Sequence, residues 1–254
     1  AGYKVGVVSR GYGAKTTEFP HQVSANDSAP MVGDEPLLIA RRTGVPVVID
    51  PNRPRAAQQL VEQGCTVIIS DDGLQHYALG RDVECVVADR RLFGNRQLLP
   101  MGPLREGLWR LNTIDFLILN QSGEALELPK SSNMPPPFHM SLQPGKLINV
   151  LHPQLQRDLV ELEHESHITA MAGIGDPSRF FNQLKEMGVR LDHCVALADH
   201  HAIGKHDIPD GCVIMTEKDA VKAVAHAHDN CWYQPVDAVL AEDFYTQLIQ
   251  RIAR

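Results

Sequence analysis

The sequence has few cysteines and no paired cysteine motif. Its five cysteines are scattered along 254 residues, and no two of them form a CxxC pair. Disulfide and zinc frameworks place cysteines at close, regular spacings. Because most of these cysteines lie inside apolar stretches, we expect them to be reduced core residues of a cytosolic protein.

Long apolar runs and an excess of positive charge are also missing. No run approaches the roughly 20 apolar residues of a membrane-spanning helix, and no signal peptide is visible. The net charge is -7 and the isoelectric point is about 5.9. A nucleic-acid partner is therefore not expected, because binding to the phosphate backbone depends on clustered Lys and Arg.

The first residues, "AGYKVGVVSRGYG", have no initiator Met and enter an apolar stretch almost at once. We interpret this start as the beginning of a piece of a longer chain. With 254 residues, of which 43% are hydrophobic, the chain can form the core of one large domain or of two small ones.

Short apolar stretches that end in polar or Gly-rich residues recur along the first half. Runs of this kind are typical of strands that are covered on both faces in a parallel sheet. Helical patterns at 33–44 and 53–64 lie between them, which predicts a doubly wound α/β sheet. The expected strands are 4–9, 45–50, 66–71, 83–89 and 115–120.

Residues 121–140, "QSGEALELPKSSNMPPPFHM", are rich in Pro and Ser and predict a connection between domains. The alternation of strand and helix patterns resumes after this segment. Apolar stretches lie in "HITAMAGIGDP", "HCVALADHH" and "GCVIMTEKDA", and helical patterns lie at 177–188 and 242–254. We therefore predict a second, smaller α/β domain.

The stretch "SDDGLQH" follows the third apolar run directly, and we expect that run to be a central parallel strand flanked by the strand that holds Val5–Val8. Ligands of open parallel sheets bind at the carboxyl ends of the strands. Paired Asp71 and Asp72 at such an end resemble a Walker B element, in which a carboxylate holds Mg²⁺ against nucleotide phosphates. The alternative is an ordinary surface turn, which Asp-Asp-Gly also favours.

Three further stretches place charged residues at turns, and each has a structural alternative. In "ADHH", Asp199 could orient a catalytic His200, or His200 could be a hydrogen-bonded structural residue. In "GDEP", Asp34 could be a helix N-cap. "TEKDAVK" is typical of a cap followed by a helix.

Taken together, these stretches resemble the tetraacyldisaccharide 4'-kinase family, the lipid A 4'-kinases of Gram-negative bacteria. The motifs occur in the family's order and span nearly the whole chain. They are "SRGYG" (9–13), "VGDEPLLIARRTGVPV" (32–47), "SDDGLQH" (70–76), "LLPMGPLREG" (98–107), "ADHH" (198–201) and "TEKDAVK" (216–222).

The resemblance implies a P-loop kinase that transfers the γ-phosphoryl group of ATP to the 4'-hydroxyl of a tetraacylated disaccharide 1-phosphate, giving lipid IVA. It implies an α/β/α core domain (1–125), a strand-like linker (126–150) and a smaller α/β/α domain (151–254). It also implies ATP and Mg²⁺ as cofactors. The expected location is the cytoplasmic face of the inner membrane, and a monomer is expected.

The resemblance also assigns site residues. Asp34 is implied as the catalytic base and His200 as its partner from the second domain. Asp71 and Asp72 are implied as the nucleotide-side Walker B pair, with Glu35 close to the metal. The positions near the sugar and phosphate of the lipid are Arg53, Gln75, His76, Arg105 and Glu106.

The chain departs from the family in one respect. The Gly-rich Walker A loop, which ends in Gly-Lys-Thr/Ser, precedes "SRGYG" in the family, and residues 1–254 do not contain its spacing. "SRGYGAKTT" matches the family's second strand instead. A chain without this loop is expected to bind ATP poorly and could be inactive.

Two alternatives remain. One is a metal-dependent hydrolase whose ligands would be drawn from Asp71, Asp72, His76, Asp199, His200 and His201, because mixtures of Asp and His bind Zn²⁺ or Mn²⁺. The other is a non-catalytic binding remnant.

Overall fold

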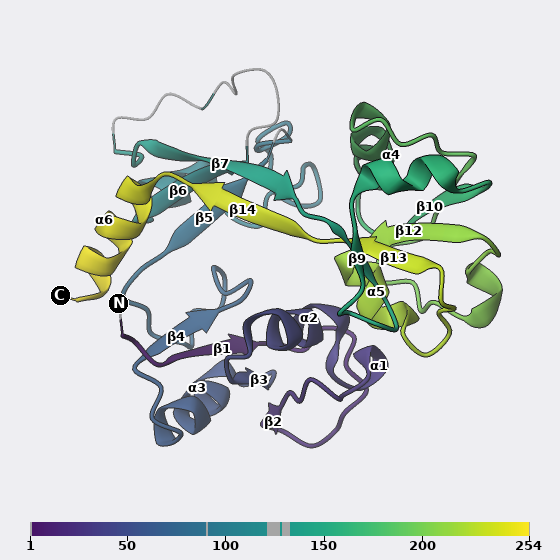
Figure 1. Ribbon diagram of the computed structural model, residues 1–254. Coiled ribbons are helices and arrows are strands. Elements are labelled where there is room, and N and C mark those ends of the chain that lie inside the picture. Colours follow the sequence, from purple (N-terminus) through teal and green to yellow (C-terminus); the bar gives the residue numbers. More distant parts are fainter. Residues whose placement is uncertain (1, 90, 121–127, 129–132, 254) are drawn as a thin grey trace. The chain divides into compact units, whose positions relative to one another are not determined.

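The computed structural model describes residues 2–89, 91–120, 128 and 133–253 (Figure 1). The chain forms two compact units. Unit 1 contains Leu74–Gln143 and Asp237–Arg254, and unit 2 contains Gly2–Gly73 and Pro144–Val236. Each unit is described by itself.

The first sheet of unit 2 has four strands in the order β2-β3-β1-β4. The strand β1 (Val5–Ser9) pairs in parallel with β3 (Val47–Ile49) and with β4 (Val67–Ser70), and the short β2 (His21–Gln22) pairs antiparallel with β3. These elements confirm three of the strands expected from apolar runs. The β-branched side chains of β3 are fully buried, as parallel strands require.

Three helices belong to this part of unit 2: α1 (Ala29–Val32), α2 (Asp34–Thr43) and α3 (Arg53–Glu62). The helix α2 ends at Gly44, which adopts a left-handed conformation with φ 66°, and glycine adopts it without steric cost. The helix α3 begins after Asn52, whose side chain accepts a hydrogen bond from the Arg55 amide. Both helices match the sequence-based prediction.

The second sheet of unit 2 has six strands in the order β11-β10-β12-β13-β8-β9. The first four strands are parallel, whereas β13 and β8, and β8 and β9, pair antiparallel. The bounds are β8 (Leu147–Asn149), β9 (Gln156–Arg157), β10 (Ile168–Ala172), β11 (His193–Ala196), β12 (Cys212–Thr216) and β13 (Cys231–Gln234).

Two helices and two 3-10 turns accompany that sheet: α4 (Pro177–Glu186), α5 (Glu217–Ala223), η2 (Leu159–His164) and η3 (Lys205–Asp207). The buried face of α4 packs Phe180, Phe181 and Leu184 against Ala170 and Ile214 of the sheet. The stretch "TEKDAVK" forms the predicted cap and helix, because the Thr216 hydroxyl accepts from the Asp219 amide.

Unit 1 contains one sheet in the order β14-β7-β6-β5. The strands β5 (Cys85–Ala88), β6 (Phe116–Asn120) and β7 (Pro137–Pro144) are parallel, and β14 (Val236–Leu240) completes the sheet. A 3-10 turn, η1 (Leu108–Asn112), precedes β6, and the terminal helix α6 (Glu242–Ile252) packs through Phe244 onto Phe116 and Phe138.

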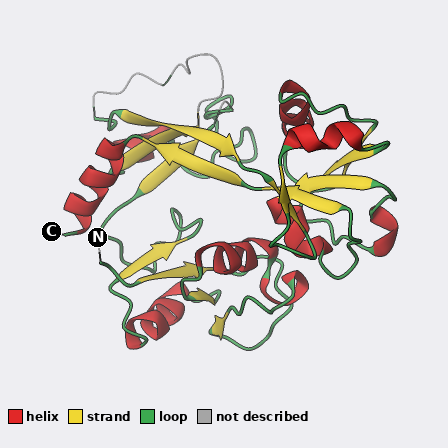
Figure 2. Ribbon diagram, in the orientation of Figure 1, coloured by secondary structure: helices red, strands yellow, loops and turns green. Residues whose placement is uncertain are grey.

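The protein is thus a mixed α/β structure with several mainly parallel sheets (Figure 2). The expected single sheet over residues 4–120 is wrong, because β1, β3 and β4 belong to one sheet and β5 and β6 to another. The prediction that the strand before Asp71 is central is wrong as well. The strand β4 pairs with β1 as expected, but it stands at the border of its sheet.

The predicted interdomain connection lies partly outside the described residues, which exclude 121–127 and 129–132. Its last residues form the start of β7. The terminal helix, which we placed in the smaller domain, falls in the same compact unit as residues 74–143. The boundaries at 125 and 150 stay a prediction.

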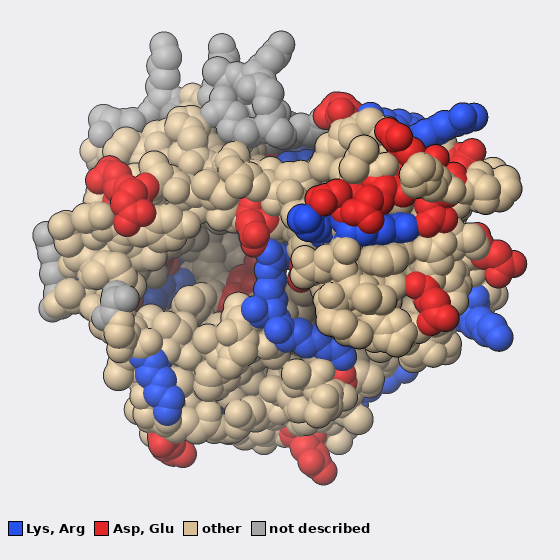
Figure 3. Space-filling model, viewed as in Figure 1, with Lys and Arg blue, Asp and Glu red and all other residues tan. Residues whose placement is uncertain are grey.

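Acidic and basic side chains lie next to each other over the six-stranded sheet on the face drawn in Figure 3. Within the described part of the chain, no helix is long and apolar enough to cross a membrane.

Candidate active site

Asp34 is the first residue of α2, and its side chain is almost fully buried at 8% exposure. The preceding Gly33 has φ 92°, and a Cβ at that position would lie 3.0 Å from the Tyr12 carbonyl oxygen. Only glycine fits such a turn without strain. The turn places the Asp34 carboxylate at a helix N-terminus, where negative charge is favourable.

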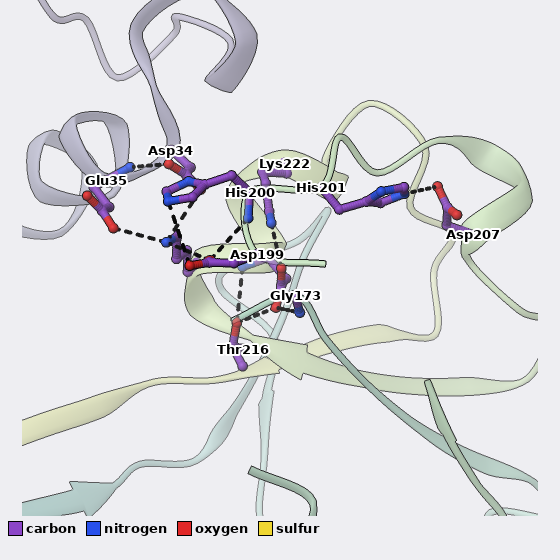
Figure 4. Close-up of polar contacts among 11 residues, drawn as sticks. Asp34, Glu35, Gly173, Asp199, His200, His201, Asp207, Thr216 and Lys222 are labelled. Carbon is purple, nitrogen blue, oxygen red and sulfur yellow. Dashed lines mark hydrogen bonds and ion pairs between the residues drawn. The ribbon is translucent and has the colours of Figure 1, made fainter. Parts of the chain in front are cut away.

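His200 contacts Asp34 directly, as Figure 4 shows. Its Nδ1 lies 3.2 Å from Asp34 Oδ2, and its Nε2 lies 3.9 Å from Asp199 Oδ2. His200 has a left-handed backbone with φ 58°, which is unusual for a residue other than glycine. The Asp199 side chain accepts a hydrogen bond from the His200 backbone amide at 3.1 Å. The Tyr12 ring packs edge to face against the imidazole, with 5.4 Å between the ring centroids.

The structure therefore brings together the two residues that the sequence analysis paired. We assigned Asp34 and His200 to different domains, but both lie in unit 2. Their roles in a reaction stay a prediction, while their contact is a feature of the fold.

Lys218 joins the same group of side chains from α5. Its Nζ lies 2.9 Å from Glu35 Oε1, 3.4 Å from Asp199 Oδ1 and 3.8 Å from Asp34 Oδ2. Burial alone would lower the pKa of Lys218, but the surrounding carboxylates outweigh this effect and raise it. We call Asp34, Glu35, Asp199, His200 and Lys218 the carboxylate–lysine cluster.

Asp71 and Asp72 follow β4 at its carboxyl end, as predicted. The Ser9 hydroxyl donates to Asp71 Oδ2 at 3.1 Å. Burial raises the pKa of Asp71, and the neighbouring charge of Asp72 raises it further, although the Ser9 bond and the Arg53 charge oppose the shift. A raised carboxyl pKa from burial and like charge indicates that the site favours an added positive charge.

This donor set fits Mg²⁺, which commonly takes only one or two carboxylates besides water and phosphate oxygens. Among the residues that the structure describes, no group of three or more His, Cys, Asp or Glu side chains could hold a metal ion. His201, which the hydrolase hypothesis names as a metal ligand, instead contacts a carboxylate, with 3.2 Å between its Nε2 and Asp207 Oδ2. The hydrolase hypothesis therefore has no metal centre in the described part of the chain.

Arg53 lies beside the carboxyl end of β4. Its side chain is buried at the start of α3, and its Nη1 donates to Ser70 Oγ at 2.8 Å. Gly73 leaves room for this arrangement, because a Cβ there would lie 2.5 Å from Ser70 Oγ and 3.1 Å from Arg53 Nη1. Arg53 is thus close to the Asp pair of the same unit.

In unit 1, Gln75 and Glu106 lie together, since Gln75 Nε2 donates to Glu106 Oε2 at 2.8 Å. The Tyr77 hydroxyl also donates to Glu106, and Arg110 Nε lies 3.5 Å from it. Partial burial would raise the pKa of Glu106, but these three partners outweigh it and the pKa is lowered. Arg105 is exposed.

Arg110 also forms an ion pair with Glu84, to which Arg81 donates at 2.8 Å. Arg81 in turn donates to the His76 carbonyl oxygen at 2.7 Å, which ties the predicted His76 to the same group. We call this group the arginine network; its members are Gln75, His76, Tyr77, Arg81, Glu84, Glu106 and Arg110.

Comparison with known proteins decides the family. The model of the tetraacyldisaccharide-1-P 4'-kinase (LpxK) family matches residues 1–253. The chain belongs to this family.

Curated members of the kinase family resemble the chain over nearly all of its length. The tetraacyldisaccharide 4'-kinase of Pseudoalteromonas atlantica is 48% identical over 99% of the chain and 79% of its own length. That of Photobacterium profundum is 49% identical over 100% of the chain and 72% of its own length. A crystal structure of LpxK from Aquifex aeolicus in complex with ATP has a TM-score of 0.82, with 26% identity over 98% of this chain and 79% of that one.

Sequence reasoning did not single out several residues that contact the predicted ones in the structure. Tyr12 and Tyr77 carried no signal beyond their place in or next to matched motifs. Lys218 stood among the charged residues of the motif "TEKDAVK", but that motif was interpreted as a cap and a helix, and Lys218 was given no role. Arg110 lies just after "GPLREG", in the 3-10 turn η1, whereas Glu106 precedes that turn, so no helical periodicity in the sequence pairs the two.

Proposed function

We propose that the protein transfers the γ-phosphoryl group of ATP to the 4'-hydroxyl of tetraacyldisaccharide 1-phosphate, giving lipid IVA in lipid A biosynthesis. Membership of the tetraacyldisaccharide 4'-kinase family supports the activity. The observation that carries the assignment to particular residues is the 3.2 Å contact between Asp34 and His200.

In this proposal Asp34 is the base. A sugar hydroxyl is a weak nucleophile, and a carboxylate within hydrogen-bond reach accepts its proton as the new P–O bond forms. The hydroxyl oxygen bonds to the γ-phosphorus while the bond from that phosphorus to the bridging oxygen of ADP breaks. His200 holds the Asp34 carboxylate in one orientation and shares the proton, which is the role of an imidazole beside a carboxylate.

Asp71 and Asp72 would hold Mg²⁺, with Glu35 close to the ion. The ion supplies charge neutralisation for the phosphate oxygens when it is bound. The support on the protein side is the raised pKa of Asp71, whose burial beside Asp72 leaves negative charge that a cation would offset.

The lipid side is assigned to Arg53, Gln75, His76, Arg105 and Glu106. Guanidinium groups suit a phosphate because they donate two parallel hydrogen bonds. The amide of Gln75 and the carboxylate of Glu106 are already held together, which orders them for contact with sugar hydroxyls.

We further propose two α/β/α domains, a P-loop-kinase-like core (1–125) and a smaller domain (151–254) joined by residues 126–150. The family resemblance further implies a monomer that acts at the cytoplasmic face of the inner membrane, where it meets its lipid substrate.

The test is transfer of label from [γ-³²P]ATP to tetraacyldisaccharide 1-phosphate, with the product resolved by thin-layer chromatography. The 254-residue chain is assayed beside the same chain preceded by the N-terminal segment of the Pseudoalteromonas atlantica relative, in which the family resemblance implies a phosphate loop. Mass spectrometry checks that the new phosphate is at the 4'-position. Absence of transfer in both forms, with the fold intact, would contradict the proposal.

A further inference from the structure

Lys218 lies where three separate segments of unit 2 meet. It is the second residue of α5, while Glu35 and Asp34 begin α2 and Asp199 follows β11. One ammonium group thus contacts three carboxylates that come from distant parts of the sequence, at residues 34, 35 and 199.

The contacts of Lys218 enclose His200. Asp34 Oδ2 faces both His200 Nδ1, at 3.2 Å, and Lys218 Nζ, at 3.8 Å. On the other side, Asp199 presents Oδ1 to Lys218 at 3.4 Å and Oδ2 to His200 Nε2 at 3.9 Å. Lys218 therefore contacts both carboxylates that flank the imidazole, and the four side chains form a closed ring.

Partial burial strengthens the electrostatic interactions in this ring. The Lys218 side chain is 18% exposed and that of Asp34 is 8% exposed, whereas Asp199 and Glu35 are half-exposed at 46% and 44%, so burial strengthens chiefly the contact with Asp34. Ion pairs in full contact with water contribute little, but like charges in a partly dry site repel strongly unless a cation separates them. Of the described residues, His200 and Lys218 form the ion pairs of Asp34.

We propose that Lys218 is a positioning residue of the kinase, which holds Asp34 and Asp199 on either side of His200 so that Asp34 faces the acceptor hydroxyl. The inference rests on the proposed function of Asp34 and His200. Lys218 acts through these carboxylates, so its removal lets Asp34 and Asp199 move apart without abolishing the sites for ATP or lipid.

The alternative role is mechanical: Lys218 could simply fasten α5 to α2. The chain offers a matched control for that role. Arg42 of α2 pairs with Glu217 of α5 at 2.6 Å, and the two side chains are 33% and 18% exposed. This pair joins the same two helices but lies outside the carboxylate–lysine cluster.

The kinetic test compares Lys218→Met, Lys218→Arg and Arg42→Met in the form of the enzyme that is active in the transfer assay. Lys218→Met should lower kcat about 10- to 100-fold, because a base displaced by about 1 Å loses activity on that scale. KM for ATP and for the lipid should change less than about threefold, since no uniform binding contact is removed. Lys218→Arg should recover much of the loss, and Arg42→Met should match the wild type.

A double-mutant cycle adds a second readout. His200→Ala combined with Lys218→Met should be hardly slower than His200→Ala alone, because Lys218 acts through the group that His200 completes. Losses that multiply would show an independent role. A loss confined to KM for ATP would make Lys218 a phosphate-binding residue and would overturn the proposal.

The 254-residue chain allows a test without turnover. The ¹⁵N signals of the His200 ring, assigned by their disappearance in His200→Gln, report the contact of Nδ1 with Asp34. They should shift in Lys218→Met and stay in place in Arg42→Met; equal spectra in all three proteins would contradict the positioning role. If the wild type itself transfers no phosphate, the proposed function fails, whereas an active Lys218→Met enzyme refutes only this inference.

Discussion

In unit 2, three carboxylates share one lysine ammonium and one imidazole, whereas in unit 1 two carboxylates are held by two arginines. The first arrangement keeps an excess of negative charge, and the second is balanced. The partners also differ in range: the arginine network lies within residues 75–110, but the carboxylate–lysine cluster joins residues 34–218.

This difference separates two kinds of site. Excess negative charge can take up a proton or a cation, which suits the chemistry of a base. A balanced network of arginines and carboxylates orients its members and resists change, which suits a surface that recognises sugar and phosphate groups. We therefore expect substitutions in unit 2 to act on kcat and substitutions in unit 1 to act on KM or on stability.

The largest effect is expected at Asp34. Either Asp34→Ala or His200→Ala should lower kcat about 10²- to 10⁴-fold with little change in KM, the range for general-base catalysis. The double mutant should be barely worse than the worse single mutant, because a coupled pair is non-additive. Steady-state kinetics of all four proteins measure this, and Glu217→Gln at the neighbouring ion pair serves as the control. Multiplicative losses would contradict a shared role.

The next effect concerns ATP, for which neither cluster supplies a phosphate loop. The 254-residue chain should bind ATP at least about 100-fold more weakly than the chain extended by the relative's N-terminal segment, because backbone amides of that loop cradle the phosphates. Isothermal titration calorimetry in the presence of Mg²⁺ measures both constants. Equal affinity would show that the nucleotide is held by other residues.

At Arg105, the expected effect is confined to the lipid. Arg105→Ala should raise KM for the tetraacyldisaccharide about tenfold, as loss of one charge-assisted contact would do, while KM for ATP stays nearly unchanged. Arg96→Ala, in the same exposed stretch, is the matched control. An equal rise of both KM values would argue against a lipid-side role.

The smallest effect is on stability, at Glu84. Hydrogen bonds from Arg110 lower the pKa of Glu84, although burial opposes the shift and Arg81 adds to it. A depressed carboxyl pKa stabilises the fold above the unfolded-state value of about 4.3 and loses that contribution as the pH falls through the folded-state pKa.

Glu84→Gln should therefore lower the free energy of unfolding by about 1–3 kcal/mol at pH 7, because a buried arginine loses a charged partner. Its difference from the wild type should shrink as the pH falls below about 4. Urea denaturation at pH 7 and at pH 3.5 checks both statements, with the exposed pair mutant Asp158→Asn as the control. A pH-independent difference would mean that Glu84 contributes through shape and not through charge.

The sequence predicted the strands that consist of β-branched apolar runs, because such runs are typical of parallel sheets. Burial on both faces holds for β3 but not for β4 and β5, where Ile69 and Val87 are exposed. It could not predict β7, whose residues Pro137–Pro144 are only partly buried and include polar and proline residues. Nor could it show that β4 stands at a border, because the order of strands depends on pairings between distant segments. In the same way, "TEKDAVK" predicted a helix cap, but the contact of Lys218 with Glu35 depends on the packing of α5 against α2.

The border position of β4 has a geometric consequence. The four-stranded sheet of unit 2 ends at β4, and the Ile69 side chain on this strand is 53% exposed. A further strand could therefore be added there by backbone pairing alone. If that strand ran parallel to β4, it would finish level with Ser70, and the loop after it would emerge beside Asp71 and Asp72. The loop that follows such a parallel strand would thus place its backbone amides next to Asp71 and Asp72. The register of the added strand would then set the distance between these carboxylates and a phosphate bound by the amides.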